Sequence, residues 1–207
     1  MERSFEAAYD EWVGPYVDLN INVLEQFPSE RDTLDQFAAR TNGLVLDLGC
    51  GPGHTTNYLR TWGTDVIGYD LSSKMITEAT RRFPDTTFAS ADLAALPHGD
   101  NAIGGIVSRY SLIHMDPTDL QPIFEHWAQL MGPGAPLLLS FFAAATPDTH
   151  GDAFDHTVAT AYQLSPEVLA GRLETAGFEQ LDVSVEPPPW GGRPIDHGVI
   201  RAVAGPG

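Results

Sequence analysis

The chain has 207 residues, of which 43% are hydrophobic, and its formal net charge is −17 at pH 7. This length suits one sizeable core and is short for two, so we expect a single domain over residues 1–207, and the absence of an apolar stretch of about 20 residues argues against a membrane span. The acidic balance, with Lys74 as the only lysine, argues against a nucleic-acid backbone or an acidic membrane surface as a partner.

Residues 1–40 have helical spacing and no strand signal. Tyr9, Trp12 and Tyr16 recur at three- and four-residue steps, as on one face of a helix. Pro15 and Pro28 are expected to interrupt this region, and a third helix is expected over 33–40. We therefore expect an N-terminal helical cap. The charged N-terminus lacks the apolar run of a signal peptide, which favours a cytoplasmic location.

Strand and helix patterns alternate through the rest of the chain. This alternation, with strands that are almost continuously apolar, predicts an α/β fold with a mostly parallel sheet and helices on both faces. No helix pattern separates the last two strands, so an antiparallel hairpin is expected at one edge. The expected strands are 44–48, 65–69, 86–90, 102–108, 136–142, 179–186 and 197–204, and the expected helices are 53–62, 72–82, 119–131 and 165–176.

The most informative motif joins the first strand to the first helix of this alternation. Residues 44–53 form an apolar run that contains Asp47 and ends in three alternate glycines, and Asp70 ends the next strand. Glycines let the backbone turn sharply beside a ligand, and a carboxylate at a strand end can bind both hydroxyls of a ribose. The alternative for Asp70 is a helix N-cap. The pattern predicts a nucleoside-binding site at this edge of the sheet.

The spacing of this motif differs from that of dinucleotide-binding turns. It reads Gly-x-Gly-x-Gly, and His54 stands where a dinucleotide fold needs a small residue. Asp47 would repel a pyrophosphate but would pair with a cationic amino-acid group. These features favour S-adenosylmethionine over a nicotinamide cofactor. Cys50, the lone cysteine, has no neighbouring base and is expected to fill the turn; it excludes an intrachain disulfide and suits a reducing cytosol.

Across about residues 40–185 the chain resembles the class I S-adenosylmethionine-dependent methyltransferases, in particular the small-molecule group with a methyltransferase-11/25-like core. The motifs that carry the resemblance are Asp47–Gly53, Gly68–Met75, Ala89–Leu93 and Ile106–Met115. The resemblance implies a Rossmann-like seven-stranded sheet with a reversed final strand. It also implies S-adenosylmethionine as cosubstrate and S-adenosylhomocysteine as product.

The resemblance assigns cofactor-binding roles to particular positions. The methionine part would lie along Asp47, Gly49, Cys50, Gly51 and Gly53, above Ser108, and Asp70 would bind the ribose. Leu71, Met75, Asp92 and Leu93 would surround the adenine, although a turn acid is an alternative for Asp92. Tyr9 and Tyr16 would fold over the cofactor, the alternative being that they form only the core face of a helix.

The acceptor side is less clearly marked. Tyr110 and His114 follow the fourth strand, and His114 is the candidate general base for a hydroxyl acceptor, the alternative being a buried or capping histidine. Segment 143–164 follows the fifth strand and is longer than a connection requires. Its His150, His156 and Tyr162 are candidates for a substrate pocket; a divalent-metal site and a solvated acidic loop are the alternatives. No structural zinc spacing is present, and no metal is expected.

These features favour methyl transfer from S-adenosylmethionine to a small-molecule acceptor by a monomer or homodimer. The segment after the fourth strand lacks the Asn-Pro-Pro-Tyr sequence of many enzymes that methylate amide or base nitrogens. One alternative is a non-catalytic module that binds S-adenosylmethionine or S-adenosylhomocysteine. A nicotinamide-dependent oxidoreductase is less favoured, because both the Gly-x-Gly-x-x-Gly turn and a Tyr-x-x-x-Lys pair are missing. The sequence does not identify the acceptor.

Overall fold

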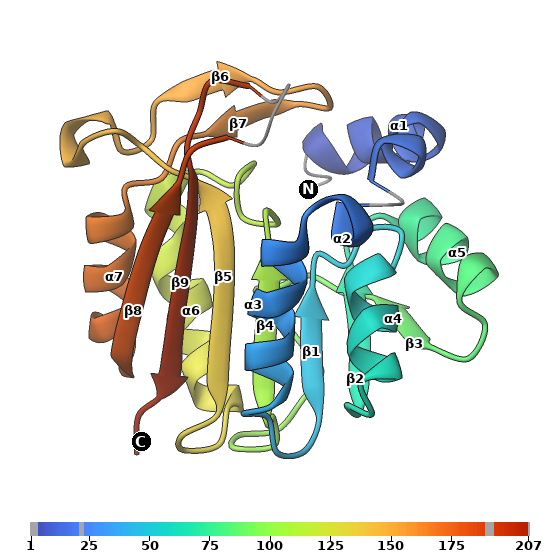
Figure 1. The fold of residues 1–207 in the computed structure, drawn as a ribbon. Helices are drawn as coiled ribbons and strands as arrows, with labels where there is room; N and C mark the ends of the chain where they lie inside the picture. The colour runs from blue at the N-terminus through green and yellow to red at the C-terminus, as the bar shows by residue number, and fades with distance from the viewer. Residues whose placement is uncertain (1–3, 21–22, 189–192, 207) are drawn as a thin grey trace.

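The computed structural model describes residues 4–20, 23–188 and 193–206 (Figure 1). Three helices precede the sheet: α1 (Ser4–Asn20), α2 (Val23–Gln26) and α3 (Pro28–Ala38). The expected interruption at Pro15 is wrong, because α1 continues through it. Gly14 and Pro15 are exposed, so water can hydrogen-bond to the carbonyl that lacks its helical donor. The third helix begins at Pro28 instead of residue 33, since a proline suits the first helical position.

The main sheet has seven strands in the order β3-β2-β1-β4-β5-β9-β8. Strands β3, β2, β1, β4 and β5 are parallel, and β9 runs antiparallel between β5 and β8. This confirms the mostly parallel sheet with an antiparallel edge hairpin. The bounds are β1 Val45–Leu48, β2 Val66–Asp70, β3 Thr87–Ser90, β4 Gly105–Arg109, β5 Pro136–Phe142, β8 Phe178–Glu186 and β9 His197–Ala204. Part of the expected loop between β8 and β9, residues 189–192, lies outside the described residues.

Helices cover both faces of the sheet, as expected. On one face, α3 and α4 (His54–Thr61) pack on alternate strand residues such as Val45 and Val107. On the other, α6 (Leu120–Leu130) and α7 (Pro166–Thr175) pack on Leu46, Ile106 and their neighbours. Helix α5 (Ser73–Arg82) packs against β2 and β3. In the described part of the chain, no helix is both long and apolar enough to cross a membrane.

Segment 143–164 contains structure that the sequence did not reveal. It holds a short 3-10 helix (Pro147–Thr149) and a separate two-stranded sheet, β6 (Ala153–Asp155) and β7 (Thr160–Tyr162). A second 3-10 helix (Pro117–Asp119) precedes α6. Figure 1 shows the β6–β7 hairpin and α1 at the same end of the molecule, above the carboxyl ends of the parallel strands. Both additions therefore lie at the carboxyl edge of the sheet.

The reversed strand β9 requires a glycine at the position that pairs with Phe141 of β5. A Cβ on Gly198 would lie 2.4 Å from two ring carbons of the fully buried Phe141. Since a packed core cannot easily shift that ring, Gly198→Ala should lower the free energy of unfolding by about 1–3 kcal/mol in urea titrations. Gly171→Ala is the matched control: Gly171 lies within α7 and a Cβ there meets nothing within 4 Å. It should raise stability by about 0.5–1 kcal/mol; equal effects of the two changes would contradict the packing argument.

Candidate active site

The turn after β1 is fixed by hydrogen bonds to the end of β2. The N–H groups of Gly49 and Cys50 donate to the carbonyl oxygen of Tyr69, at 2.7 and 2.9 Å, and the N–H of Gly51 donates to Oδ2 of Asp70 at 2.8 Å. Gly49 has a φ of +74° and Gly51 a φ of +52°. The turn therefore needs left-handed backbone to direct its successive amides toward β2.

The three motif glycines have different neighbours. A Cβ on Gly49 would lie 2.2 Å from Cβ of Ser111, and one on Gly53 would lie 2.6 Å from the ring of Phe88, so both positions are required for packing. A Cβ on Gly51 would instead point into a cavity toward Tyr16, 3.7 Å away. Gly51 is thus the position where a missing side chain leaves room for a ligand.

This cavity, which we call the turn cavity, lies at the carboxyl ends of β1, β2 and β4. Its volume is about 70 Å³, and α1 covers it with Tyr9 and Tyr16. A ligand the size of a nucleoside would require these two side chains to move outward. The predicted site residues on its walls are Tyr9, Tyr16, Gly49, Gly51, Asp70, Leu71, Asp92, Leu93, Tyr110 and His114.

Asp70 holds the backbone of the turn and also lines this cavity. Its carboxylate accepts hydrogen bonds from the N–H of Gly51 and, at 2.9 Å, from the N–H of Ser72. Burial raises the pKa of Asp70. The alternative that Asp70 caps a helix is wrong, because Ser72 is the N-cap of α5 and its Oγ accepts from the N–H of Met75. Asp70 is therefore left at the cavity wall, beside the glycine turn.

The loop after β3 brings Asp92 and Leu93 to the same cavity. Oδ1 of Asp92 accepts from the N–H of Ala94 at 3.0 Å, so Asp92 also forms the turn that was its alternative reading. The fully buried Trp127 of α6 donates its indole N–H to the carbonyl oxygen of Leu93 at 2.9 Å. A core tryptophan thus fixes the loop that lines the site.

Several predicted cofactor residues do not line the turn cavity: Asp47, Cys50, Gly53, Met75 and Ser108. Asp47 is buried and accepts from Oγ1 of Thr56 at 2.6 Å, and burial raises its pKa to about 6. Oγ of Ser108 lies 2.5 Å from Oγ of Ser111. Burial raises the pKa of the Cys50 thiol well above its usual value, which suits a turn filler. Direct ligand contact by these residues stays a prediction.

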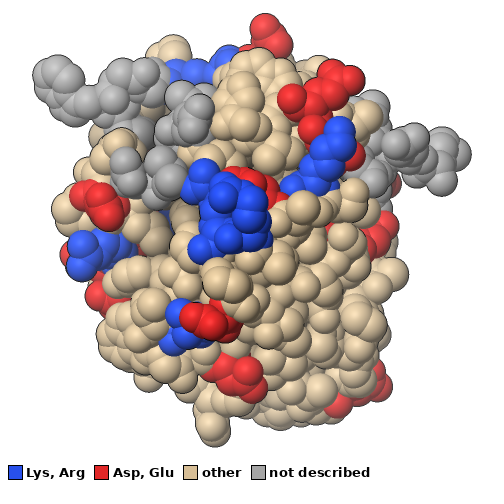
Figure 2. All heavy atoms as spheres, turned by 90° about the vertical axis from the view of Figure 1, so that its right-hand side faces the viewer, with Lys and Arg blue, Asp and Glu red and all other residues tan. Residues whose placement is uncertain are grey.

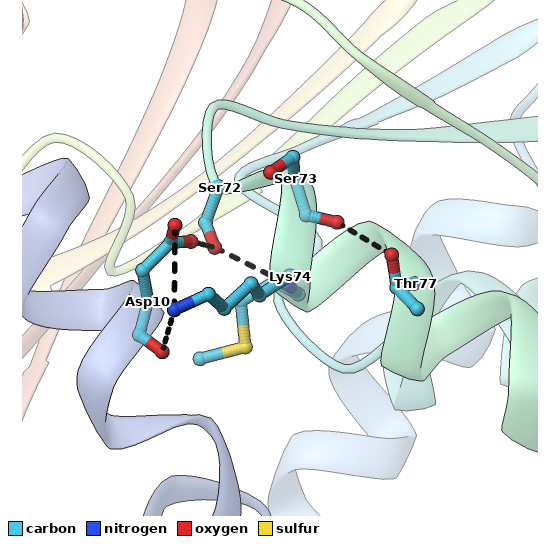
Figure 3. A network of polar contacts seen from close by, with 6 residues as sticks. Asp10, Ser72, Ser73, Lys74 and Thr77 are labelled. Carbon is cyan, nitrogen blue, oxygen red and sulfur yellow. Dashed lines mark hydrogen bonds and ion pairs between the residues drawn. The ribbon is translucent and has the colours of Figure 1, made fainter.

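Helix α1 is attached to the N-terminus of α5 (Figure 3). Oγ of Ser72 donates to Oδ1 of Asp10 at 2.5 Å, while Nζ of Lys74 donates to the Asp10 carbonyl oxygen at 3.3 Å. The same Ser72 hydroxyl caps α5. One serine therefore connects the covering helix to the helix that begins beside Asp70.

His114 forms a defined hydrogen-bonded pair with Tyr9. Nδ1 of His114 lies 2.7 Å from the carbonyl oxygen of Thr160. A carbonyl oxygen can only accept a hydrogen bond, so Nδ1 must carry the proton. Nε2 then accepts from the Tyr9 hydroxyl at 2.9 Å. Burial lowers the pKa of His114, which keeps the ring neutral. The β6–β7 hairpin thus sets the tautomer through Thr160, and His114 has a basic nitrogen facing α1.

Arg109 lines the turn cavity, and the sequence analysis did not select it. It ends β4, forms an ion pair with Glu30 of α3 and donates from Nη1 to Oγ1 of Thr55 at 3.1 Å. Its side chain is 9% exposed. Its position at the end of a parallel strand was the available signal, but its partners come from distant segments.

A second cavity, the acceptor cavity, adjoins the turn cavity and has a volume of about 660 Å³. Tyr9, Tyr16, Arg109 and Tyr110 line both. Tyr110 has a strained φ of +55°, and its hydroxyl lies 2.8 Å from Nδ1 of His197. Other lining residues include Trp12, Phe27, Glu30, Ile113, Phe142, His156, Glu186 and His197.

The remaining candidates of segment 143–164 do not meet there. His156 lines the acceptor cavity, whereas His150 and Tyr162 line neither cavity. Nδ1 of His150 accepts from the N–H of Ser165 at 2.9 Å, and the N–H of Tyr162 donates to the carbonyl oxygen of Ile113 at 2.7 Å. Within the described residues, no group of three or more His, Cys, Asp or Glu is arranged to hold a metal ion, so the metal alternative for this segment has no support.

Comparisons with known proteins find methyltransferases. Residues 45–134 match a family model described as a methyltransferase domain. A protein of Bacillus mycoides named as an uncharacterized methyltransferase is 28% identical over 188 residues, which cover 88% of this chain and 86% of that relative.

Solved structures with the same fold include a SAM-dependent methyltransferase of Methanosarcina mazei, with a TM-score of 0.67, 21% identity, and coverage of 80% of this chain and 93% of that one. Another is phosphoethanolamine N-methyltransferase 2 of Haemonchus contortus in complex with phosphomonomethylethanolamine and S-adenosylhomocysteine. Its TM-score is 0.74 at 17% identity, with coverage of 98% of this chain and 60% of that one.

His54, the first residue of α4, should make stability depend on pH. Burial, together with nearby Arg109, lowers the pKa of His54 to about 3, and its Nδ1 is enclosed without a hydrogen-bond partner. His54 therefore binds a proton near pH 6.5 in the unfolded chain but only near pH 3 in the folded chain. Because the unfolded state binds more protons between these values, the free energy of unfolding decreases as the pH falls through that range.

We expect His54→Asn to reduce the loss of unfolding free energy between pH 6.5 and 4.5 by about 2 kcal/mol relative to the unmodified chain. Urea titrations at both values measure this difference. Other titrating groups, including Asp47, act in both proteins and cancel. Identical pH dependence of the two proteins would show that the His54 ring is protonated in the folded state.

Proposed function

We propose that this chain is a class I S-adenosylmethionine-dependent methyltransferase that transfers a methyl group to a small-molecule acceptor bound in the acceptor cavity. One observation carries the proposal: the turn cavity and the acceptor cavity share four wall residues, and the Tyr9–His114 pair lies where they meet. A cosubstrate and an acceptor can therefore approach each other there without crossing bulk water.

The residues of the turn cavity suit S-adenosylmethionine. The open side of Gly51 leaves room for the amino-acid part of the ligand. Asp70 offers carboxylate oxygens to the two ribose hydroxyls, and Leu71 and Leu93 offer apolar surface to the adenine. When bound, S-adenosylmethionine supplies a methyl group on a sulfonium, so that its S–C bond breaks as the acceptor lone pair forms the new bond and neutral S-adenosylhomocysteine departs.

The protein's own contribution is alignment, exclusion of water and handling of one proton. Once the Tyr9 hydroxyl has left Nε2 of His114 to make room for the cosubstrate, a hydroxyl acceptor can donate to that nitrogen directly. The neutral ring takes up the proton as the new bond forms, and its Nδ1–H stays on the Thr160 carbonyl. Helix α1 and the β6–β7 hairpin cover this region and limit the access of water (Figure 1).

Surface charge supports a small molecule over a nucleic acid. Figure 2 views the side of the molecule that carries α5, where basic and acidic side chains are interspersed. The adjacent Arg81 and Arg82 both form ion pairs with Glu78, at 2.8 and 2.6 Å. A phosphate backbone needs a continuous basic surface, and this pairing offers none.

Asp70→Ala should weaken the binding of S-adenosylhomocysteine. Loss of the carboxylate leaves ribose hydroxyls unpaired, which costs about 1–3 kcal/mol, or roughly 5- to 150-fold in Kd by isothermal titration calorimetry. Asp182→Ala, at an exposed position of β8, is the matched control and should leave Kd unchanged. Thermal unfolding of both variants checks the fold. Unchanged affinity of a folded Asp70→Ala protein would show that this carboxylate does not bind the nucleoside.

His114→Asn should lower kcat about 10²- to 10⁴-fold, because asparagine can still donate to Thr160 but cannot take up the proton. Transfer of a labelled methyl group to the best acceptor from a panel of small hydroxyl, thiol and amine compounds measures this effect. His98→Asn, outside both cavities, is the control. Binding of S-adenosylhomocysteine without transfer to any acceptor would favour the non-catalytic module over an enzyme.

A further inference from the structure

The walls of the acceptor cavity indicate the chemical class of its ligand. We infer that the acceptor is an uncharged compound with an aromatic ring that bears a hydroxyl group, because the cavity is walled by aromatic and imidazole rings and its charged side chains are already paired or acidic. This inference rests on the proposed function and narrows its substrate.

Phe142, one of the lining residues, is in contact with four other rings. Its ring centroid lies 5.3 Å from those of Tyr110, Phe154 and His197 and 5.9 Å from that of His156. These rings come from four separate segments of the chain, and Trp12 of α1 adds another wall. Flat, polarisable surfaces at several orientations favour a ligand that is itself an aromatic ring, through edge-to-face and offset contacts.

The charged residues of the cavity argue against an anionic acceptor. Among the described residues that line it, Arg109 is the one permanent cation, and Glu30 and Thr55 already engage its guanidinium. Glu186 adds a further negative charge to the wall. A phosphate or carboxylate would therefore have to displace Glu30 from Arg109 and face Glu186 as well.

The buried titratable groups argue against charge of either sign. Burial lowers the pKa of His156 to about 4 and also lowers that of His197, so these imidazoles stay neutral. Burial raises the pKa of Tyr16 to about 12 and raises that of Tyr110. Surroundings that suppress both imidazolium and phenolate impose the same desolvation cost on an ammonium or an anionic ligand.

A neutral hydroxyl on such a ring has suitable partners. Neutral imidazole offers an acceptor nitrogen, and Nε2 of His114 provides one at the boundary with the turn cavity once Tyr9 has moved outward. The hydroxyl would thereby be directed toward the turn cavity while the ring remains among the aromatic walls. This arrangement satisfies the polar atom and buries the apolar ring.

Four matched probes test the inference on the full chain saturated with S-adenosylhomocysteine: 2-naphthol, 2-naphthoate, 2-(aminomethyl)naphthalene as its cation, and decahydro-2-naphthol. They share size and differ in charge or aromaticity. Calorimetry at pH 7 should give 2-naphthol a Kd at least 10-fold lower than each of the other three. Equal or tighter binding of either ion, or equal binding of the saturated alcohol, overturns the inference, as does equally weak binding of all four.

Trp12→Leu removes one aromatic wall and should raise the Kd of 2-naphthol at least 5-fold without changing that of S-adenosylhomocysteine. Trp62→Leu makes the same chemical change at a residue that is 48% exposed and lines neither cavity, and should change neither constant. Equal Kd values for 2-naphthol in the two variants would overturn the assignment of this cavity.

The first titration, with S-adenosylhomocysteine alone, separates the two levels of the argument. Failure of that ligand to bind contradicts the proposed function. Binding of S-adenosylhomocysteine, combined with a preference for a charged probe, contradicts only the inferred acceptor class.

Discussion

The site depends on one local constraint, which is that the chain leaving β1 folds back onto the end of β2. The amides of Gly49, Cys50 and Gly51 all point toward β2, two to a carbonyl oxygen and one to the Asp70 carboxylate. L-residues with side chains rarely adopt the left-handed backbone that this needs. The same bonds fix the carboxylate beside the open face of Gly51. The proposed cosubstrate site is thus a consequence of how two neighbouring strands are hydrogen-bonded together.

In the proposed reaction, α1 and the β6–β7 hairpin, which cover the sheet edge, act by excluding water. Helix α1 contributes Tyr9, and the β6–β7 hairpin contributes the Thr160 carbonyl, so His114 is held between them as a neutral ring with a defined tautomer. Burial that lowers histidine pKa values and raises those of tyrosines also makes any electrostatic interaction inside stronger. A sulfonium loses its positive charge during methyl transfer, and a poorly solvated site favours that loss.

The attachment of α1 connects these two halves of the site. Ser72 caps α5 and donates to Asp10 of α1, so the helix that starts next to Asp70 is also bonded to the helix that covers the turn cavity. The small volume under Tyr9 and Tyr16 implies that this cover moves when a nucleoside-sized ligand enters. The Lys74 contact is exposed and weak, whereas Ser72 is buried, so the movement costs mainly the Ser72–Asp10 and Tyr9–His114 hydrogen bonds.

The sequence by itself determined the seven-stranded sheet, its reversed strand, and the arrival of Gly51, Asp70 and Asp92 at one edge, since strand–helix alternation sends the carboxyl ends of parallel strands to the same side. Local signals did not determine the continuation of α1 through Pro15 or the β6–β7 hairpin. Only the tertiary structure decided that Arg109 meets Glu30 and that His114 lies between Tyr9 and Thr160. Those partners are far apart along the chain. The packing of whole helices and strands brings them together, and the spacing of residues in the sequence does not predict these contacts.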